Sequence, residues 1–218
     1  MTDADETLDA LRLRLAPAVA AAAVFDGWSE AAVTQAAADT GVDPSLAAFA
    51  FRDGQMTMIS AWIGSVDAQM AEVLPADTLR AMPVRERIRS LVQSRLDAIV
   101  GLEEALSRAL SIMAMPRNVA AALKLGWHSA DVMWRLAGDT ATDYNHYTKR
   151  AILASVYGAT LSVFASDGSE GKAETRAFLD RRLDGIMRFE KAKAKLLPGS
   201  GDHFSPARFF GRLRYPAR

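Results

Sequence analysis

Periodic apolar residues divide the chain into consecutive helical segments, and this pattern limits the fold more than any other feature. In the first segment, Leu8, Leu11 and Leu15 are three and four residues apart, which places them on one face of a helix over residues 7–24. Leu11, Leu13 and Leu15 also alternate, so a strand is a weak alternative there. Alanine is abundant and β-branched runs are few, which favours helix. We therefore predict an all-α chain.

Capping residues, glycines and prolines separate the later segments. Ser29 is a good N-cap, and Asp43 precedes a helix with Pro44 in its first turn. Gly138 suits the left-handed position that ends a helix. We expect a bundle of about nine to ten helices. Those after the first are predicted over residues 30–39, 44–51, 55–73, 83–100, 102–115, 117–137, 143–166 and 172–197.

The two short segments on either side of Gly41 have the spacing of a helix-turn-helix. DNA affinity comes largely from neutralised phosphates, but residues 45–49, SLAAF, carry no positive charge. We therefore predict a vestigial helix-turn-helix kept for packing and no nucleic-acid partner. A TetR-type ligand-responsive repressor is the alternative. Residues 26–53 hold one base, Arg52, and five acids: Asp26, Glu30, Asp39, Asp43 and Asp53.

Catalytic and metal-binding patterns are scarce in the sequence. It has no cysteine, no E-x-x-H motif and no phosphate-cradling glycine loop. His128 and Asp131 are three residues apart and could pair, structurally rather than catalytically; an enzyme using them is the weaker alternative. We predict a non-enzyme with no metal and no cofactor. A solvated basic face is expected on the segment 83–100, from Arg85, Arg87, Arg89 and Arg95.

Aromatic and charged side chains are concentrated in residues 131–150, DVMWRLAGDTATDYNHYTKR. Thr140 and Asp143 have the spacing of a capping box, so a tight corner between two helices is expected. An ordinary helix start with half-buried tyrosines is one interpretation. The other is a recognition surface, because Trp, Tyr and Arg are common interface anchors. Candidate partner-binding residues are Asp131, Trp134, Asp143, Tyr144, His146, Tyr147 and Arg150.

The pattern D-x-x-W-x-x-A-G-D-x-x-T-D-Y-N-x-Y-T-K-R in this corner resembles the signature of the Coq-nine family. These are lipid-binding accessory proteins of ubiquinone (coenzyme Q) biosynthesis with a TetR-like fold. The segments FDGWSEAAVTQAAADTGV and TRAFLDRRLDGIM resemble other recurrent parts of the family, and the likeness spans about residues 7–188. His146 departs from it, since the family usually has Trp there.

This resemblance implies a lipid cavity between the central helices, holding an isoprenoid lipid such as a quinone intermediate. It also implies that the intermediate is presented to the demethoxyubiquinone hydroxylase, with residues 131–150 as the docking face. TetR-like proteins pair through their last two helices, so a homodimer is expected. Candidate lipid-binding residues are Met113, Met115, Leu123, Trp127, Met133, Leu136, Ile152, Val156, Tyr157 and Phe164.

The composition changes after residue 197. A PGSGD linker leads to a segment rich in aromatics and arginines, which suits an anionic membrane surface. A disordered tail or a strap on the domain is the alternative. The acidic start and short apolar runs favour a cytoplasmic protein peripheral to the cytoplasmic membrane. We predict parts at 1–53, 54–197 and 198–218, with membrane contacts from Phe204, Phe209, Phe210 and Leu213.

Overall fold

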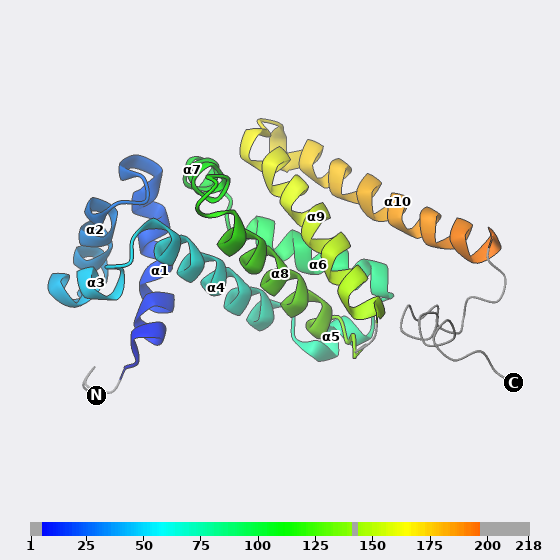
Figure 1. Ribbon diagram of the computed structural model, residues 1–218, viewed down its shortest axis with the longest axis horizontal. Coiled ribbons are helices and arrows are strands. Elements are labelled where there is room, and N and C mark those ends of the chain that lie inside the picture. Colours follow the sequence, from blue (N-terminus) through cyan, green and yellow to red (C-terminus); the bar gives the residue numbers. More distant parts are fainter. Residues whose placement is uncertain (1–5, 141–143, 197–218) are drawn as a thin grey trace, which may run out of the picture. The chain divides into compact units, whose positions relative to one another are not determined.

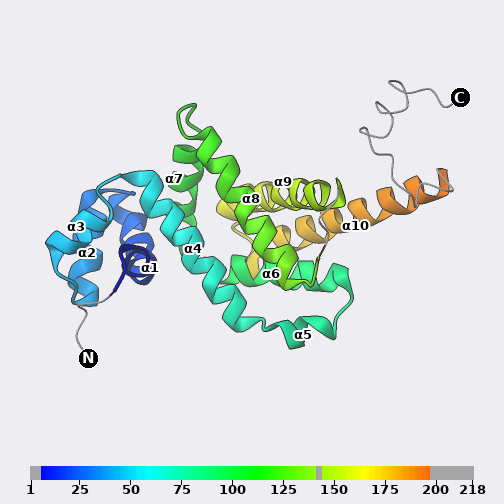
Figure 2. The same cartoon turned by 60° about the horizontal axis from the view of Figure 1, so that its bottom comes forward.

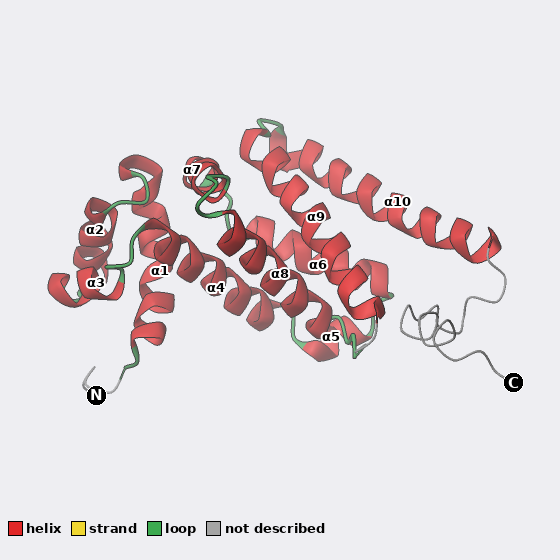
Figure 3. Ribbon diagram, viewed as in Figure 1, coloured by secondary structure: helices red, strands yellow, loops and turns green. Residues whose placement is uncertain are grey.

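The structure is a computed structural model that describes the backbone of residues 6–140 and 144–196. All the regular structure in these ranges is helical, with ten α-helices, one 3-10 turn and no strand (Figures 1 and 3). The predicted all-α class is confirmed. The helices are α1 (Leu8–Asp26), α2 (Glu30–Thr40), α3 (Pro44–Ala50), α4 (Gln55–Val73), α5 (Ala76–Arg80), α6 (Val84–Asp97), α7 (Glu103–Met113), α8 (Val119–Leu136), α9 (Tyr144–Ser166) and α10 (Ala173–Leu196).

Helices α1, α2 and α3 pack against one another at the N-terminal end (Figure 1). The predicted caps are confirmed. The Ser29 hydroxyl accepts a hydrogen bond from the backbone N–H of Ala32 at 3.3 Å, and Asp43 accepts one from Ser45 at 2.9 Å. Gly41 ends α2 with φ 69° and ψ 24°, a left-handed conformation that favours glycine. These local interactions fix the helix-turn-helix shape.

Helix α4 leads from this N-terminal group to the central helices. It packs against α6, α7 and α8, and α8 in turn packs against α9 (Figure 2). Helix α7 also contacts α9. Helices α4, α7, α8 and α9 therefore surround a common interior.

Trp28 connects the N-terminal helices to this central group. Only 2% of its surface is exposed, and its indole N–H donates to the carbonyl oxygen of Ala105 in α7 at 2.9 Å. Its ring lies 5.3 Å from that of Trp62 in α4, centroid to centroid. One side chain thus joins the turn before α2 to two central helices.

Two expectations differ from the structure. Helix α5 was not predicted, because a single turn of five residues is too short to show periodicity. The prediction of a solvated basic face on α6 is wrong for Arg95, which is 1% exposed. Arg87 and Arg89 are half-buried: Arg87 donates to the carbonyl of Ala137 at 2.7 Å, and Arg89 to Asp180 at 2.6 Å.

The chain divides into two compact units, residues 1–180 and 181–218. In the second unit, the described part is the continuation of helix α10 to Leu196. The predicted membrane segment, with Phe204, Phe209, Phe210 and Leu213, lies outside the described residues. Among the helices that the structure describes, none combines the length and apolar character needed to cross a membrane. The predicted division at 1–53, 54–197 and 198–218 remains a prediction.

Replacing Trp28 with Phe should lower the free energy of unfolding by about 1–3 kcal/mol, because the buried hydrogen bond from the indole N–H to the Ala105 carbonyl is lost and the smaller ring fills less of the core. Urea denaturation followed by circular dichroism measures this. Phe25→Leu is the control, since Phe25 is 82% exposed and should change stability by less than about 0.5 kcal/mol. Equal unfolding midpoints for the two variants would contradict this role of Trp28.

Candidate functional site

A largely apolar cavity of about 590 Å³ lies inside the central helices. Helix α4 contributes Trp62, α7 contributes Met113, α8 contributes Trp127 and α9 contributes Tyr157. Its volume falls in the range of small-molecule sites, which is roughly 300–1,000 Å³. Well-packed protein interiors leave few voids larger than a water molecule. This space is therefore a candidate ligand site rather than ordinary core.

Small residues create the open space. Gly126 in α8 and Gly158 in α9 both line the cavity, and a Cβ added at either would meet no atom within 4 Å. Ala122 and Ala154 lie on the same two helices and also line it. Larger side chains at these positions would occupy the interior.

Four of the predicted lipid-binding residues line the cavity: Met113, Leu123, Trp127 and Tyr157. The other six are not part of the lining. Met133 and Phe164 are fully buried in the core, and Met115 is 38% exposed beyond the end of α7. The remaining three, Leu136, Ile152 and Val156, are half-buried elsewhere on α8 and α9.

The sequence analysis missed the cavity residues of α4 and α6, including Trp62 and Arg95, and those of α7 other than Met113, including Leu106. A signal for Arg95 was present, because in the predicted segment 83–100 it lies on the apolar stripe of Ile88, Leu91 and Ile99. A charged residue on a buried stripe points to an interior polar site.

Arg95 forms a buried ion pair with Asp67 of α4 beside the cavity. Its guanidinium also donates to the Ser129 hydroxyl of α8 at 3.2 Å and stacks 4.9 Å from the ring centre of Tyr157. Burial raises the pKa of Asp67, while the charge of Arg95 acts in the opposite direction. Asp67 Oδ2 and Arg95 Nε are buried and have no hydrogen-bond partner within the structure. The cavity therefore has one strongly polar part of its wall.

The predicted corner joins α8 to α9, and its first half is confirmed. Gly138 has φ 88°. The Gly138 N–H donates to the carbonyl oxygen of Arg135, and the Asp139 N–H donates to the carbonyl oxygen of Trp134, each at 2.9 Å. This double pattern is a Schellman motif. Asp143, the second residue of the capping box expected with Thr140, lies outside the described residues, so this cap remains a prediction.

Arg150 is the centre of an ion-pair cluster at this corner. It is 1% exposed, and its Nε lies 2.5 Å from Asp131 and its Nη1 lies 3.1 Å from Asp139. Lys149 adds a second pair to Asp139 at 2.6 Å, and the Trp134 indole donates to the Lys149 carbonyl at 3.0 Å. Arg150 thus holds α8 and α9 together and is not a surface group.

The corner carboxylates keep their charge to low pH. Burial acts to raise the pKa of Asp131, but the hydrogen bond from Arg150 and the charge of Arg135 outweigh it, so the pKa lies below its usual range. The pKa of Asp139 is lowered in the same way, against the effect of burial, by hydrogen bonds from Lys149 and Arg150.

Tyr147 is the surface residue of the predicted partner site, with 61% of its area exposed. Its ring lies 6.0 Å from that of Trp127 and 5.1 Å from that of His146. The three rings form one aromatic group where α8 meets α9. The position of Asp143 and the side chain of Tyr144 lie outside the described residues.

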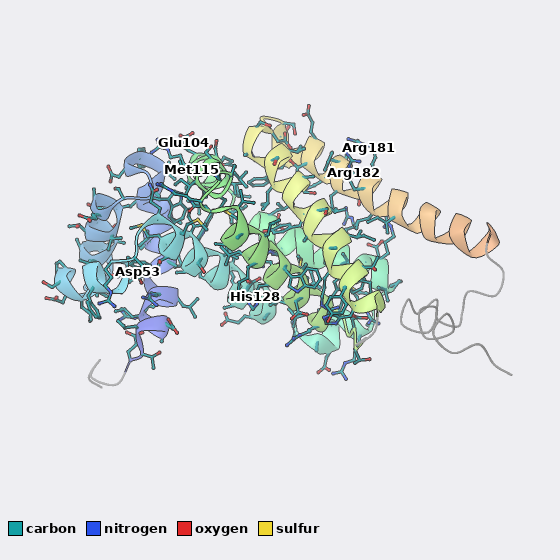
Figure 4. All side chains as sticks on the ribbon, viewed as in Figure 1. Asp53, Glu104, Met115, His128, Arg181 and Arg182 are labelled. Carbon is teal, nitrogen blue, oxygen red and sulfur yellow. The ribbon has the colours of Figure 1, made fainter. Side chains whose placement is uncertain are left out.

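His128, labelled in Figure 4, is exposed on α8 and lines a separate hollow with Arg12 and Lys124. Asp131 pairs instead with Arg150 and with Arg135, which lies 2.8 Å away. The structure therefore does not bring His128 and Asp131 together as a hydrogen-bonded pair. In the described part of the chain, no three His, Cys, Asp or Glu residues gather into a possible metal site.

The fold is that of TetR-like proteins. The structure of a TetR transcriptional regulator from Nitrosomonas europaea is similar with a TM-score of 0.63 and 20% identity, covering 80% of this chain and 96% of that one. At this identity the likeness concerns the fold alone.

The family model for COQ9 matches residues 119–190, which include the cavity walls of α8 and α9 and the corner between them. The ubiquinone biosynthesis protein COQ9, mitochondrial, of Rattus norvegicus is 30% identical over 167 residues, covering 74% of this chain and 54% of its own length. The Homo sapiens protein of the same name is 31% identical over 168 residues, with 74% and 52% covered. The predicted resemblance to this family is confirmed, and the chain is a COQ9 homologue that spans about half the length of these relatives.

Replacing Arg150 with Met should lower the free energy of unfolding by about 3 kcal/mol, because two largely buried carboxylates lose their buried partner and each keeps only an exposed one, Arg135 or Lys149. Denaturant unfolding measures this loss. Arg135→Met is a matched control: Arg135 also pairs with Asp131, but its side chain is 72% exposed, so the change should cost about 1 kcal/mol or less.

The same variant should alter the dependence of stability on pH. The lowered pKa values of Asp131 and Asp139 contribute stability above the usual Asp range, and this is lost as the pH falls below about 4. Arg150→Met should therefore show a shallower loss in acid than the unchanged protein. Parallel acid titrations of the two proteins would contradict the account of the corner.

Proposed function

We propose that the chain is a non-catalytic lipid-binding accessory factor of ubiquinone biosynthesis. It binds an isoprenoid quinone intermediate in the central cavity and presents it to the demethoxyubiquinone hydroxylase at the membrane. The observation that carries this proposal is the largely apolar cavity of about 590 Å³ between α4, α7, α8 and α9. The names of the COQ9 relatives, which are ubiquinone biosynthesis proteins, support the pathway.

The lining suits a flexible apolar chain. Its largest contributions come from aliphatic and aromatic side chains, with Met113 as an adaptable wall and Gly126 and Gly158 as open positions. Leu123 lines the cavity and is also 70% exposed, so the lining continues to the protein surface. A ligand entering beside Leu123 would keep its tail out of water along its whole path.

The exposed aromatic group at the corner supports a docking face. Tyr147 contacts Trp127, and Trp127 itself lines the cavity. A partner seated on Tyr147 and His146 would therefore lie one side chain away from the bound lipid. This proximity fits transfer of the lipid to a hydroxylase that supplies the metal chemistry.

The membrane and the second copy of the chain complete the proposal. The tail with Phe204, Phe209, Phe210 and Leu213 is proposed to bind an anionic membrane surface, which would place the protein at the periphery of the cytoplasmic membrane. The relatives in the rat and human are named as mitochondrial. Pairing of two chains through α9 and α10 is the proposed dimer.

A transcription repressor is the competing function, because the similar solved structure is a TetR transcriptional regulator. The surface of α3 opposes it: Leu46 and Phe49 are 42% and 46% exposed there. The nearby cation, Arg52, stacks 4.6 Å from the Phe49 ring and lies 3.8 Å from Asp53. Such a surface offers little to DNA phosphates.

Filling the cavity should reduce lipid binding. Gly158→Leu places a side chain in the open interior, so protein purified from a quinone-producing host should yield severalfold less isoprenoid in solvent extracts than the unchanged chain. Chromatography with mass detection, normalised to protein, gives the ratio. Gly126→Leu should act in the same way from the opposite helix.

Gly185→Leu is the matched control for this experiment. Gly185 is also a helical glycine with no atom within 4 Å of an added Cβ, but it does not line the cavity. Its extract should equal that of the unchanged chain. Lipid-free extracts from all the proteins, or an undiminished yield from Gly158→Leu, would refute binding in this cavity.

Tyr147→Ala should weaken binding of the hydroxylase about thirtyfold, since truncating an interface hot spot costs about 2 kcal/mol. Tyr147 is exposed, so the variant should remain folded. His146→Trp should preserve or strengthen binding, because it adds apolar area beside Tyr147. Titrating each variant over immobilised hydroxylase gives its dissociation constant. Phe25→Ala is the control, since Phe25 is also exposed. A folded His146→Trp protein that no longer binds would show that this face does not dock.

A further inference from the structure

A second hollow, of about 550 Å³, lies between α1, α4 and α8. Its size also falls in the range of small-molecule sites. Thr57 and Ser60 of α4 line this hollow, whereas Ile59 and Trp62, on a different face of the same helix, line the central cavity. Leu125 of α8 lines both spaces. The hollow is therefore a neighbour of the cavity and not a part of it.

Four hydrogen-bonding side chains line the hollow, and within the described part of the chain none of them forms a hydrogen bond. They are Thr57 and Ser60 on α4 and Lys124 and His128 on α8; Figure 4 labels His128. The members of each pair are three or four residues apart, so they share a helix face. Because α4 packs against α8, the two pairs border the same space. Together they offer two hydroxyls, an ammonium group and an imidazole N–H.

The hollow carries positive charge that its own residues do not balance. Asp9 and Arg12 of α1 also line it, but they pair with each other at 2.9 Å, and Arg12 donates to the Ala50 carbonyl at 2.7 Å. Among the described lining residues, no carboxylate is left to pair with Lys124. A metal ion would find a single carboxylate there, already engaged, although hard cations need several oxygen ligands. An anion fits the hollow better.

The remaining lining is apolar and comes from the same three helices. Leu13 of α1, Met56 of α4 and Leu125 of α8 all border the hollow, and Leu13 is 41% exposed. An inorganic anion would leave these side chains in contact with water. A phosphate group has several acceptor oxygens, which match donors from two helices. A hydrocarbon body attached to that group would cover the apolar part.

We propose that this hollow is a second binding site, which takes a phosphate monoester with a small apolar body. Lys124 and His128 bind the phosphate oxygens together with the hydroxyls of Thr57 and Ser60, and Leu13 contacts the apolar body. A soluble phosphate ester and the headgroup of a phosphatidic acid share this chemistry. The site goes beyond the proposed function, because it does not depend on lipid binding in the central cavity.

Benzyl phosphate is the soluble probe, and benzyl alcohol and inorganic phosphate represent its two halves. Equilibrium dialysis against the full-length protein at neutral pH measures all three. Benzyl phosphate should bind with a dissociation constant below about 1 mM and at least about tenfold more tightly than either half. Dihexanoylphosphatidic acid, kept below its micelle concentration, is the lipid probe. The probe that binds more tightly in a manner dependent on Lys124 identifies the source of the phosphate.

Lys124→Gln should weaken binding of benzyl phosphate by about tenfold, because a hydrogen bond between charged groups is lost. Lys124 is exposed, so the variant should remain folded. Arg117→Gln is the matched control, since it removes the same charge from an exposed position just before α8 that does not line the hollow. Its affinity should be unchanged. Leu13→Ala should weaken binding severalfold, through the lost apolar contact.

Three results would overturn the proposal. The first is that neither benzyl phosphate nor dihexanoylphosphatidic acid binds the unchanged protein below about 1 mM. The second is that benzyl alcohol binds as tightly as benzyl phosphate, because the hollow would then recognise the apolar body alone. The third is an equal loss of affinity in Lys124→Gln and Arg117→Gln, because binding would then follow the overall charge of the protein and not this site.

Discussion

The ion-pair cluster of Arg150 with Asp131 and Asp139 is the interaction on which the functional part of the molecule depends. It fixes the corner between α8 and α9 through a guanidinium that is 1% exposed. The same two helices carry the glycine positions of the cavity and the exposed aromatic group with Tyr147. The positions of the cavity wall and of the proposed docking face are therefore set by one local constraint. A change at Arg150 should disturb both together.

The cavity stays unfilled because the side chains that line it are small where α8 and α9 approach each other. A closely packed interior would be more stable, since unfilled volume forfeits dispersion contacts. Gly126 and Gly158 leave that volume open, and the Asp67–Arg95 pair adds a desolvation cost beside it. Both features reduce stability, and the first suits a bound molecule. A ligand with an apolar chain would offset the first of these costs.

The sequence predicted the class, nine of the helices and three of the caps, because these depend on local residues. Ser29, Asp43 and Gly138 occupy the predicted cap positions, and α4 has the predicted bounds Gln55–Val73. The site was harder, because a residue on an apolar stripe can face the core or the cavity with the same spacing. Met113 and Met133 illustrate this: the first lines the cavity and the second is in the core. Arg150 was expected on a surface, but its partners come from another helix, which periodicity does not reveal.

Native mass spectrometry of the full-length protein, purified from its own host without added lipid, tests the central claim most directly. The account predicts a chain that carries a bound mass, released on activation and identified as an isoprenoid, and a Gly158→Leu chain from the same host with little of it. Detection of the chain only at the mass of the polypeptide, or release of charged phospholipids alone, would contradict the account.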